Sequence, residues 1–227
     1  MMGRGAEAGA IDHRLWKDRF EAGRALAGRF EDLRGRGGDC TLLALPRGGV
    51  PVAAEMARLL NLPLACWAVR KIAHPFYPEY AIGAVAPGGV VLWDRQDGGF
   101  LHLSETERAA LVADQQRELE RRRAVFGDPE AATLRGRHLV VVDDGIATGM
   151  TVRAALLSLR RCDPASLTLA VPVVDREVVE DLRRLVDRLE ALEVVADLRA
   201  VGLWYVSFEQ MTDQQVLALL GQGGPPG

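Results

Sequence analysis

A run of four aliphatic residues at 139–142 ends in two adjacent aspartates, Asp143 and Asp144, and a loop of small residues follows them. An apolar run this short, bounded by a turn signal, is typical of a strand buried on both faces. Apolar residues then recur at helical spacing over 152–159. In open α/β sheets, ligands bind at the carboxyl ends of the parallel strands. The sequence therefore predicts that both carboxylates lie at the ligand-binding edge of such a sheet.

The same alternation of strand, loop and helix recurs along the chain, and no long linker divides it. Strands are expected at 41–45, 64–69 and 167–174, and helices at 14–33, 52–60 and about 176–192. Alternating elements joined by short loops predict an α/β fold with a doubly wound, mostly parallel sheet. We therefore expect a single domain over 1–227, with its core at about 36–71 and 136–200 and a hood and insertion at about 12–35, 72–135 and 200–220.

The expected insertion contains a loop, a hairpin and a long helix. Two prolines favour a loop over 72–81, and Pro87, Gly88 and Gly89 separate two short apolar runs that predict a hairpin over 81–93. Residues 104–126 are highly charged and helical in pattern, with a thin apolar stripe that predicts a position on the surface or at an interface. The three arginines at 121–123 are expected to form a solvated face of this helix.

Composition excludes several classes of protein. The chain has 227 residues, of which 48% are hydrophobic, and its formal net charge is −3. This balance gives no support to nucleic-acid binding by bulk charge, and no apolar run approaches the ~20 residues of a membrane span. Three scattered cysteines predict a reduced, cytoplasmic protein, and four dispersed histidines predict no metal site built by the protein alone. Residues 1–11 are expected to be a frayed tail.

The loop after the acidic pair brings together groups that suit different parts of one ligand. Gly145 and Gly149 permit close approach of the backbone, and the first amides of the next helix suit an anion. Thr148 and Thr151 add hydroxyl donors. Two carboxylates do not bind phosphate, so they are expected to accept hydrogen bonds from a ribose diol. The alternative is that the acidic pair is only a turn and a helix cap.

This segment resembles the phosphoribosyl pyrophosphate (PRPP) binding motif of the type I phosphoribosyltransferases, in which an apolar strand precedes an acidic pair and a Gly/Ala/Thr loop. The resemblance implies that Asp143 and Asp144 contact the ribose hydroxyls and act in catalysis. It also implies a 5-phosphate site formed by Gly145, Ala147, Thr148, Gly149 and Thr151.

A second motif, Arg47-Gly48-Gly49, follows the first core strand and leaves the same expected edge of the sheet. Unhindered amides and a guanidinium suit pyrophosphate oxygens, although such a step taken alone is a structural turn. In the family that this chain resembles, the corresponding loop binds pyrophosphate. The resemblance implies a cis peptide at either the Pro46–Arg47 or the Arg47–Gly48 bond.

A third group, Arg70, Lys71 and His74, resembles the basic strand end that opens the mobile catalytic loop in orotate-type members. The resemblance implies that Lys71 and Arg70 offset charge on departing pyrophosphate, with His74 as a further candidate. From about residue 14 to 220 the chain is similar to a bacterial group of uncharacterised phosphoribosyltransferases. It departs from this group at 74–77 and at Ser207, which leaves the acceptor open.

The resemblance implies a pentosyl transferase that moves the phosphoribosyl group from PRPP to a nitrogen acceptor and releases pyrophosphate. It implies Mg²⁺ as cofactor, carried by PRPP and water-bridged to one of the aspartates, and a homodimer with a role in nucleotide metabolism. Core packing or stacking of the acceptor ring are alternatives for a set of aromatic residues: Trp16, Trp93, Trp204 and Tyr205. The alternative function is a PRPP-sensing regulator without turnover, or a partner active only within a complex.

Overall fold

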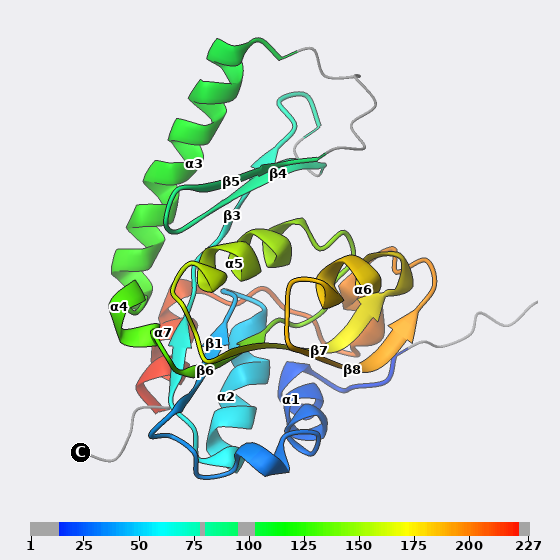
Figure 1. The fold of residues 1–227 in the computed structure, drawn as a ribbon. Helices are drawn as coiled ribbons and strands as arrows, with labels where there is room; N and C mark the ends of the chain where they lie inside the picture. The colour runs from blue at the N-terminus through cyan, green and yellow to red at the C-terminus, as the bar shows by residue number, and fades with distance from the viewer. Residues whose placement is uncertain (1–13, 78–79, 95–102, 223–227) are drawn as a thin grey trace, which may run out of the picture.

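A five-stranded parallel sheet lies between two layers of helices in the computed structural model, which describes residues 14–77, 80–94 and 103–222 (Figure 1). The strand order is β2-β1-β6-β7-β8, and all four neighbouring pairs are parallel. The strands are β1 (Cys40–Ala44), β2 (Leu64–Cys66), β6 (His138–Val142), β7 (Ser166–Asp175) and β8 (Arg188–Val195). The predicted doubly wound α/β fold is therefore confirmed.

Helices cover both faces of this sheet, which explains why its central strands are almost continuously apolar. In Figure 1, α1 (Arg19–Ala27) and α2 (Gly49–Leu60) lie below the sheet, and α5 (Met150–Arg160) and α6 (Arg176–Arg183) lie above it. The remaining short elements are η1 (Glu31–Leu33), α4 (Ala131–Leu134), η2 (Val201–Trp204) and α7 (Asp213–Gln222).

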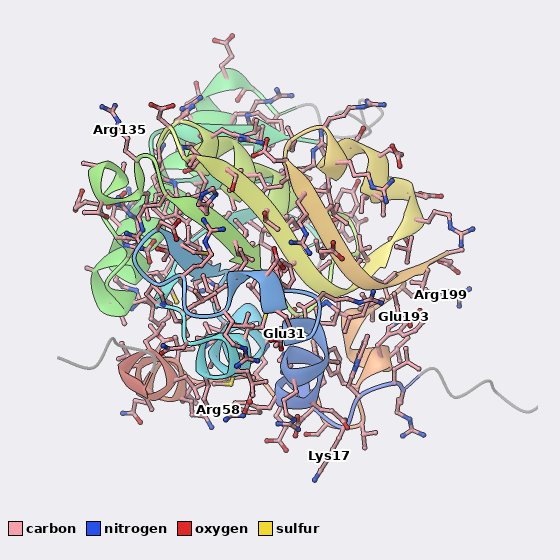
Figure 2. The ribbon with its side chains drawn as sticks, turned by 60° about the horizontal axis from the view of Figure 1, so that its bottom comes forward. Lys17, Glu31, Arg58, Arg135, Glu193 and Arg199 are labelled. Carbon is pink, nitrogen blue, oxygen red and sulfur yellow. The ribbon has the colours of Figure 1, made fainter. Side chains whose placement is uncertain are left out.

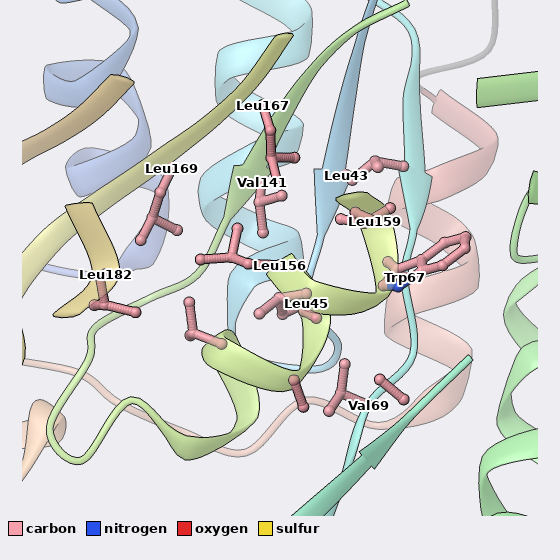
Figure 3. Close-up of a cluster of buried hydrophobic side chains, with 14 of the residues drawn as sticks. Leu43, Leu45, Trp67, Val69, Val141, Leu156, Leu159, Leu167, Leu169 and Leu182 are labelled. Carbon is pink, nitrogen blue, oxygen red and sulfur yellow. The ribbon is translucent and has the colours of Figure 1, made fainter. Parts of the chain in front are cut away.

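Alternate side chains of each central strand enter different cores, as the two-residue period of a strand requires. Leu43, Val141 and Leu169 belong to the core that includes Leu156 of α5 (Figure 3). Their neighbours Leu42, Val140 and Ala170 belong to the core on the opposite face, which includes Met56 of α2. The central strands are therefore held from both sides, and their carboxyl ends form a rigid edge.

A separate antiparallel sheet is formed by β3 (Arg70–Ala73), β4 (Ala81–Ala86) and β5 (Val90–Trp93). The predicted hairpin is its β4–β5 pair. The long helix α3 (Glu105–Phe126) packs along one side of this sheet, and α5 contacts its other side (Figure 1). Ser104 and Glu107 form a capping box that starts α3, and the left-handed Gly127 ends it.

Three expectations about secondary structure are corrected. The helix expected at 176–192 ends at Arg183, because the chain then turns back and pairs as β8 with the edge of β7. The helix expected at 14–33 is reduced to α1 and η1, since hydrogen bonds from Arg29 and Phe30 to Leu26 and Ala27 tighten its end. The strand expected at 64–69 stops at Cys66.

Two further points concern the extent of the description. The tail expected at 1–11 lies outside the described residues. Within the described ranges, no helix combines the length and the apolar character that crossing a membrane requires.

Candidate active site

Asp143 and Asp144 follow β6, the central strand of the parallel sheet, between the ends of β1 and β7. The backbone amide of Asp144 donates a hydrogen bond of 2.9 Å to Oδ1 of Asp143. Both residues are partly buried. The sequence predicted that the two aspartates lie at the carboxyl edge of the parallel sheet, and the structure places them there.

The two carboxyl groups differ in their surroundings. Burial raises the pKa of Asp143 well above its ordinary value, and the negative charge of Asp144 raises it further. Burial also raises the pKa of Asp144, but the charge and the hydrogen bond of Arg19 oppose that rise. Because like charges this close resist joint ionisation, Asp144 carries the negative charge of the pair and Asp143 holds its proton to higher pH.

Arg19, the first residue of α1, holds Asp144 in place, and the sequence did not identify it as a site residue. Its Nε lies 2.6 Å from Oδ2 of Asp144, and its Nη1 donates to the carbonyl oxygen of Glu209 at 2.9 Å. Its guanidinium stacks over the ring of Phe208 at 3.6 Å. One feature of the sequence could have identified it: Arg19 stands on the buried stripe of α1, three residues before Ala22 and seven before Leu26.

Tyr205 supports the backbone of the same aspartate. Its hydroxyl donates a hydrogen bond of 2.6 Å to the backbone carbonyl oxygen of Asp144. The ring is buried and packs against Trp16 and Phe208, with centroid distances of 5.6 and 5.1 Å. Of the two roles considered for Trp16 and Tyr205, core packing is therefore the one that the structure supports.

The Arg47-Gly48-Gly49 loop lies directly against the acidic pair. A Cβ on Gly48 would come 2.1 Å from Oδ2 of Asp144, and a Cβ on Gly49 would come 2.4 Å from the carbonyl oxygen of Val142. Any side chain at either position would therefore push the loop and the pair apart. The cis peptide that was expected in this loop is the Pro46–Arg47 bond.

The loop after the pair connects β6 to the start of α5. The backbone of Ile146 forms two hydrogen bonds with β7. Its amide donates to the carbonyl oxygen of Val173, and its carbonyl oxygen accepts from the amide of Asp175. Gly149 has a φ of +70°, which favours glycine, and directly precedes α5. No side chain among the described residues caps α5, so its first amides face the edge of the sheet uncapped.

The individual predicted 5-phosphate residues share this loop and the first turn of α5. Thr148 is exposed, and Thr151 is partly buried in the first turn. Gly145 packs so closely on Val201 that a Cβ there would lie 2.4 Å from a methyl group of that side chain. Ala147 packs against the aromatic cluster that contains Tyr205. The structure thus brings the acidic pair, the glycine loop and the start of α5 to one edge.

Arg70 and Lys71 begin β3 and are not the end of β2 as the sequence suggested. The chain leaves the parallel sheet after Cys66, and Arg70 and Lys71 pair with β4 instead. Arg70 faces α3, where its Nε donates to Gln115 at 3.3 Å. Lys71 is exposed and lies on the opposite face of β3.

His74 serves the loop that follows β3. Its Nδ1 accepts hydrogen bonds of 3.1 Å from the backbone amides of Phe76 and Tyr77. The imidazole also packs against the ring of Tyr77, with centroids 5.0 Å apart. The structure therefore gives His74 a role in shaping this turn, and no described contact joins it to the acidic pair.

The donor set at the edge suits Mg²⁺ only in part. Carboxylate oxygens are the hard ligands that Mg²⁺ prefers, and Asp143 and Asp144 supply them. The described residues contain no group of three or more side chains able to hold a metal ion. Because Arg19 already occupies Oδ2 of Asp144, the remaining ligands would have to come from water and from oxygens of the substrate.

Known proteins resemble this chain over most of its length. The phosphoribosyl transferase domain family matches residues 17–203. Two Mycobacterium tuberculosis proteins, each named as a candidate phosphoribosyl transferase, are 39% identical over 208 residues, which are 91% of this chain and 46% of theirs. The chain therefore spans about half the length of these curated relatives.

A solved structure extends the likeness to the fold. A crystal structure of a Thermus thermophilus protein has 37% sequence identity and a TM-score of 0.68, and the match covers 90% of this chain and 97% of that one. The family match covers the acidic pair, both loops and the core sheet. The chain belongs to the phosphoribosyl transferase family.

Proposed function

We propose that the protein transfers the phosphoribosyl group of PRPP to a nitrogen acceptor, a nucleobase or a related heterocycle, and releases pyrophosphate. The observation that carries this proposal is the contact between Gly48 and the carboxylate of Asp144. The reaction breaks the bond between the ribose and pyrophosphate, so groups that hold the two parts must lie next to each other. In this chain Gly48 and the carboxylate of Asp144 are in van der Waals contact.

Each part of PRPP has a partner of suitable chemistry at the edge. The uncapped amides at the start of α5, with Thr148 and Thr151, suit the 5-phosphate. The ribose hydroxyls donate to the acidic pair. Arg47 and the amides of Gly48 and Gly49 suit the pyrophosphate, because a guanidinium and unhindered amides are donors only.

Charge stabilisation and positioning supply the catalysis in this proposal. The C1–oxygen bond breaks, its electron pair leaves with pyrophosphate, and the lone pair of the acceptor nitrogen forms the new bond to C1. The proton that the acceptor loses passes to the pyrophosphate or to water. The ribose carries positive charge in between, which the ionised carboxylate of Asp144 stabilises. Arg47 and the nearby Arg70 offset the charge of the leaving group. Bound Mg²⁺ supplies further neutralisation of the pyrophosphate oxygens.

The test is to incubate the protein with PRPP, Mg²⁺ and a panel of purines, pyrimidines and other nitrogen heterocycles, and to follow pyrophosphate release. We expect release that depends on one acceptor class and is lost in Asp144→Asn. Arg135→Gln, at the amino end of β6, serves as a folded control. PRPP binding without release for any acceptor would contradict transfer and favour a PRPP-responsive regulator.

A further inference from the structure

Four arginines from three parts of the chain meet beside the Arg47-Gly48-Gly49 loop. Arg47 belongs to that loop, Arg70 starts β3, and Arg121 and Arg122 lie on α3. We call these four residues, with their acidic partners Glu118 and Asp213, the arginine cluster. The expectation that α3 presents a solvated basic face is wrong for Arg122, whose side chain is only 16% exposed.

Asp213, the first residue of α7, joins Arg47 to α3. Its Oδ1 lies 3.5 Å from Nη1 of Arg47, and its Oδ2 lies 4.0 Å from Nη2 of Arg121. Oδ1 is buried, yet within the described part of the chain it accepts no hydrogen bond. The carboxylate is thus close enough to both guanidinium groups to neutralise them, but it does not use their donors well.

Positive charge exceeds negative charge in the cluster. Glu118 bonds to Arg121 at 2.7 Å and to Arg122 at 3.0 Å, and these contacts lower its pKa to about 2, so it stays ionised. Four guanidinium groups then face two carboxylates. Burial, and the nearby charges of Arg122, Arg121 and Arg47, lower the pKa of Arg70. The cluster therefore carries an excess of positive charge that a polyanion relieves. The side chains of Arg47 and Arg121 are 33% and 52% exposed, so a ligand can reach both.

A diphosphate group matches this arrangement better than Asp213 does. It carries more negative charge than one carboxylate, and its oxygens are spread widely enough to accept from both Arg47 and Arg121. Among the described residues, the side chain of Asp213 makes two long contacts, with Arg47 and Arg121, and it remains 35% exposed, so it can leave without unfolding α7. Thr212 and Gln215 cap α7 independently of Asp213.

We propose that Arg121 of α3 is a second guanidinium for the diphosphate group of the substrate, and that Asp213 holds Arg47 and Arg121 until the diphosphate displaces it. This inference rests on the proposed function and extends its pyrophosphate site from one loop to α3. It makes Asp213 an internal competitor of the ligand. Removal of Arg121 and removal of Asp213 should therefore change diphosphate affinity in opposite directions.

The experiment measures binding of inorganic pyrophosphate and of ribose 5-phosphate, each by calorimetry at one fixed ionic strength. Arg121→Gln should weaken pyrophosphate binding about tenfold, since it removes a charge-assisted hydrogen bond, and should leave ribose 5-phosphate within about twofold. Asp213→Asn should tighten pyrophosphate binding by about two- to fivefold, because it removes a partly exposed competing ion pair.

Matched controls separate local contacts from overall charge. Arg135→Gln makes the same charge change at a residue that pairs with Asp163 and points outward at the amino end of β6 (Figure 2). Glu105→Gln repeats the Asp213 change in the first turn of α3, about four turns from Arg121. Equal effects of Arg121→Gln and Arg135→Gln, or of Asp213→Asn and Glu105→Gln, would overturn the inference.

The proposed function and this inference fail in different ways. If the unaltered protein binds neither pyrophosphate nor ribose 5-phosphate, the proposed function is wrong and the arginine cluster has no substrate to hold. If it binds both, and neither variant differs from its control, the site stands and the role of Arg121 is wrong. Asp213→Asn keeps the capping residues of α7, so the test survives even if Arg121→Gln disturbs α3.

Discussion

The Nε of Arg19 lies 2.6 Å from Oδ2 of Asp144, so the carboxylate beside the glycine loop is oriented by a residue 125 positions earlier in the chain. The same carboxylate is what a Cβ on Gly48 would strike first. Asp144 is thus fixed from α1 on one side and from the loop on the other, while the side chain of Asp143 accepts a hydrogen bond from the amide of Asp144. The two aspartates therefore have different tasks.

Replacing Arg19 should shift the pH dependence of turnover. Without the guanidinium, the pKa of Asp144 rises, so the pH at which activity appears should also rise in Arg19→Gln. Arg19→Lys, which keeps the charge, should shift it less. The measurement is kcat/KM against pH for the three proteins. Arg24→Gln, on the exposed side of the same helix, is the control.

Loss of the Arg19 pair should also destabilise the fold. Breaking a buried ion pair by removing one partner costs about 3–5 kcal/mol. Protonation of Asp144 offsets part of this cost, so the effect on denaturant unfolding should be largest above neutral pH. An Arg19→Gln protein with the stability and pH profile of Arg24→Gln would contradict the assigned role.

Gly48→Ala should abolish most of the turnover while the protein stays folded. The new Cβ would come 2.1 Å from Oδ2 of Asp144, so either the loop or the carboxylate must move by an ångström or more. A displacement of that size costs roughly a hundredfold in rate. Gly38→Ala meets no atom within 4 Å and should leave turnover unchanged. Equal activity of the two variants would show that the close contact is irrelevant to the reaction.

Asp143→Asn should stabilise the protein and inactivate it. The raised pKa of Asp143 means that the folded state holds its proton more tightly than the unfolded state does. Its contribution to the free energy of unfolding is therefore greatest below about pH 4 and falls as pH rises. Denaturant midpoints at pH 5 and pH 8 should show that the advantage of the amide grows with pH. A variant less stable at both would mean that the charge holds the turn together.

Asp128 gives a second pH dependence, away from the site. It accepts a hydrogen bond of 2.7 Å from the amide of Ala68, its side chain is 1% exposed, and burial raises its pKa to about 6. Because folding raises the pKa of this acid, the free energy of unfolding of the protein falls as pH rises from about 4 to about 6. At ~1.36 kcal/mol per pKa unit, the loss is about 3 kcal/mol.

Asp128→Asn keeps an oxygen for the Ala68 amide and does not titrate. The free energy of unfolding of this variant should therefore change less between pH 4 and pH 6.5 than that of the unaltered protein. Asp163→Asn, an exposed residue, is the matched control. Identical pH profiles of Asp128→Asn and the unaltered protein would show that Asp128 titrates normally.

The parallel core was predictable because its signals are local. Residues 139–142 are apolar on both faces, and a single sequence window contains the strand, the acidic pair and the helix start. The hairpin was predictable for the same reason, since Gly88 and Gly89 both take the positive φ that their turn requires. β8 was missed because residues 188–195 mix charged and apolar residues, and only pairing with β7 makes them a strand.

The site was predictable only where one segment carries its chemistry. Arg19 and Tyr205 reach the edge of the sheet from α1 and from the segment after η2, and no spacing in the sequence reports those contacts. The same holds for the contact of Arg121, on α3, with Asp213. Arg121 in particular stands in a run of arginines and glutamates that has the composition of an exposed helix. Its meeting with Asp213 depends on the packing of α3 against α7.

The most direct test of the account is the effect of PRPP on thermal unfolding, because it requires no knowledge of the acceptor. A ligand that binds only the folded state at a hundredfold excess over its Kd adds ~2.7 kcal/mol to the free energy of unfolding. We predict that PRPP with Mg²⁺ raises the Tm of the unaltered protein, and raises that of the Asp143→Asn, Asp144→Asn double variant less. No rise in the Tm of the unaltered protein at millimolar PRPP would contradict the account.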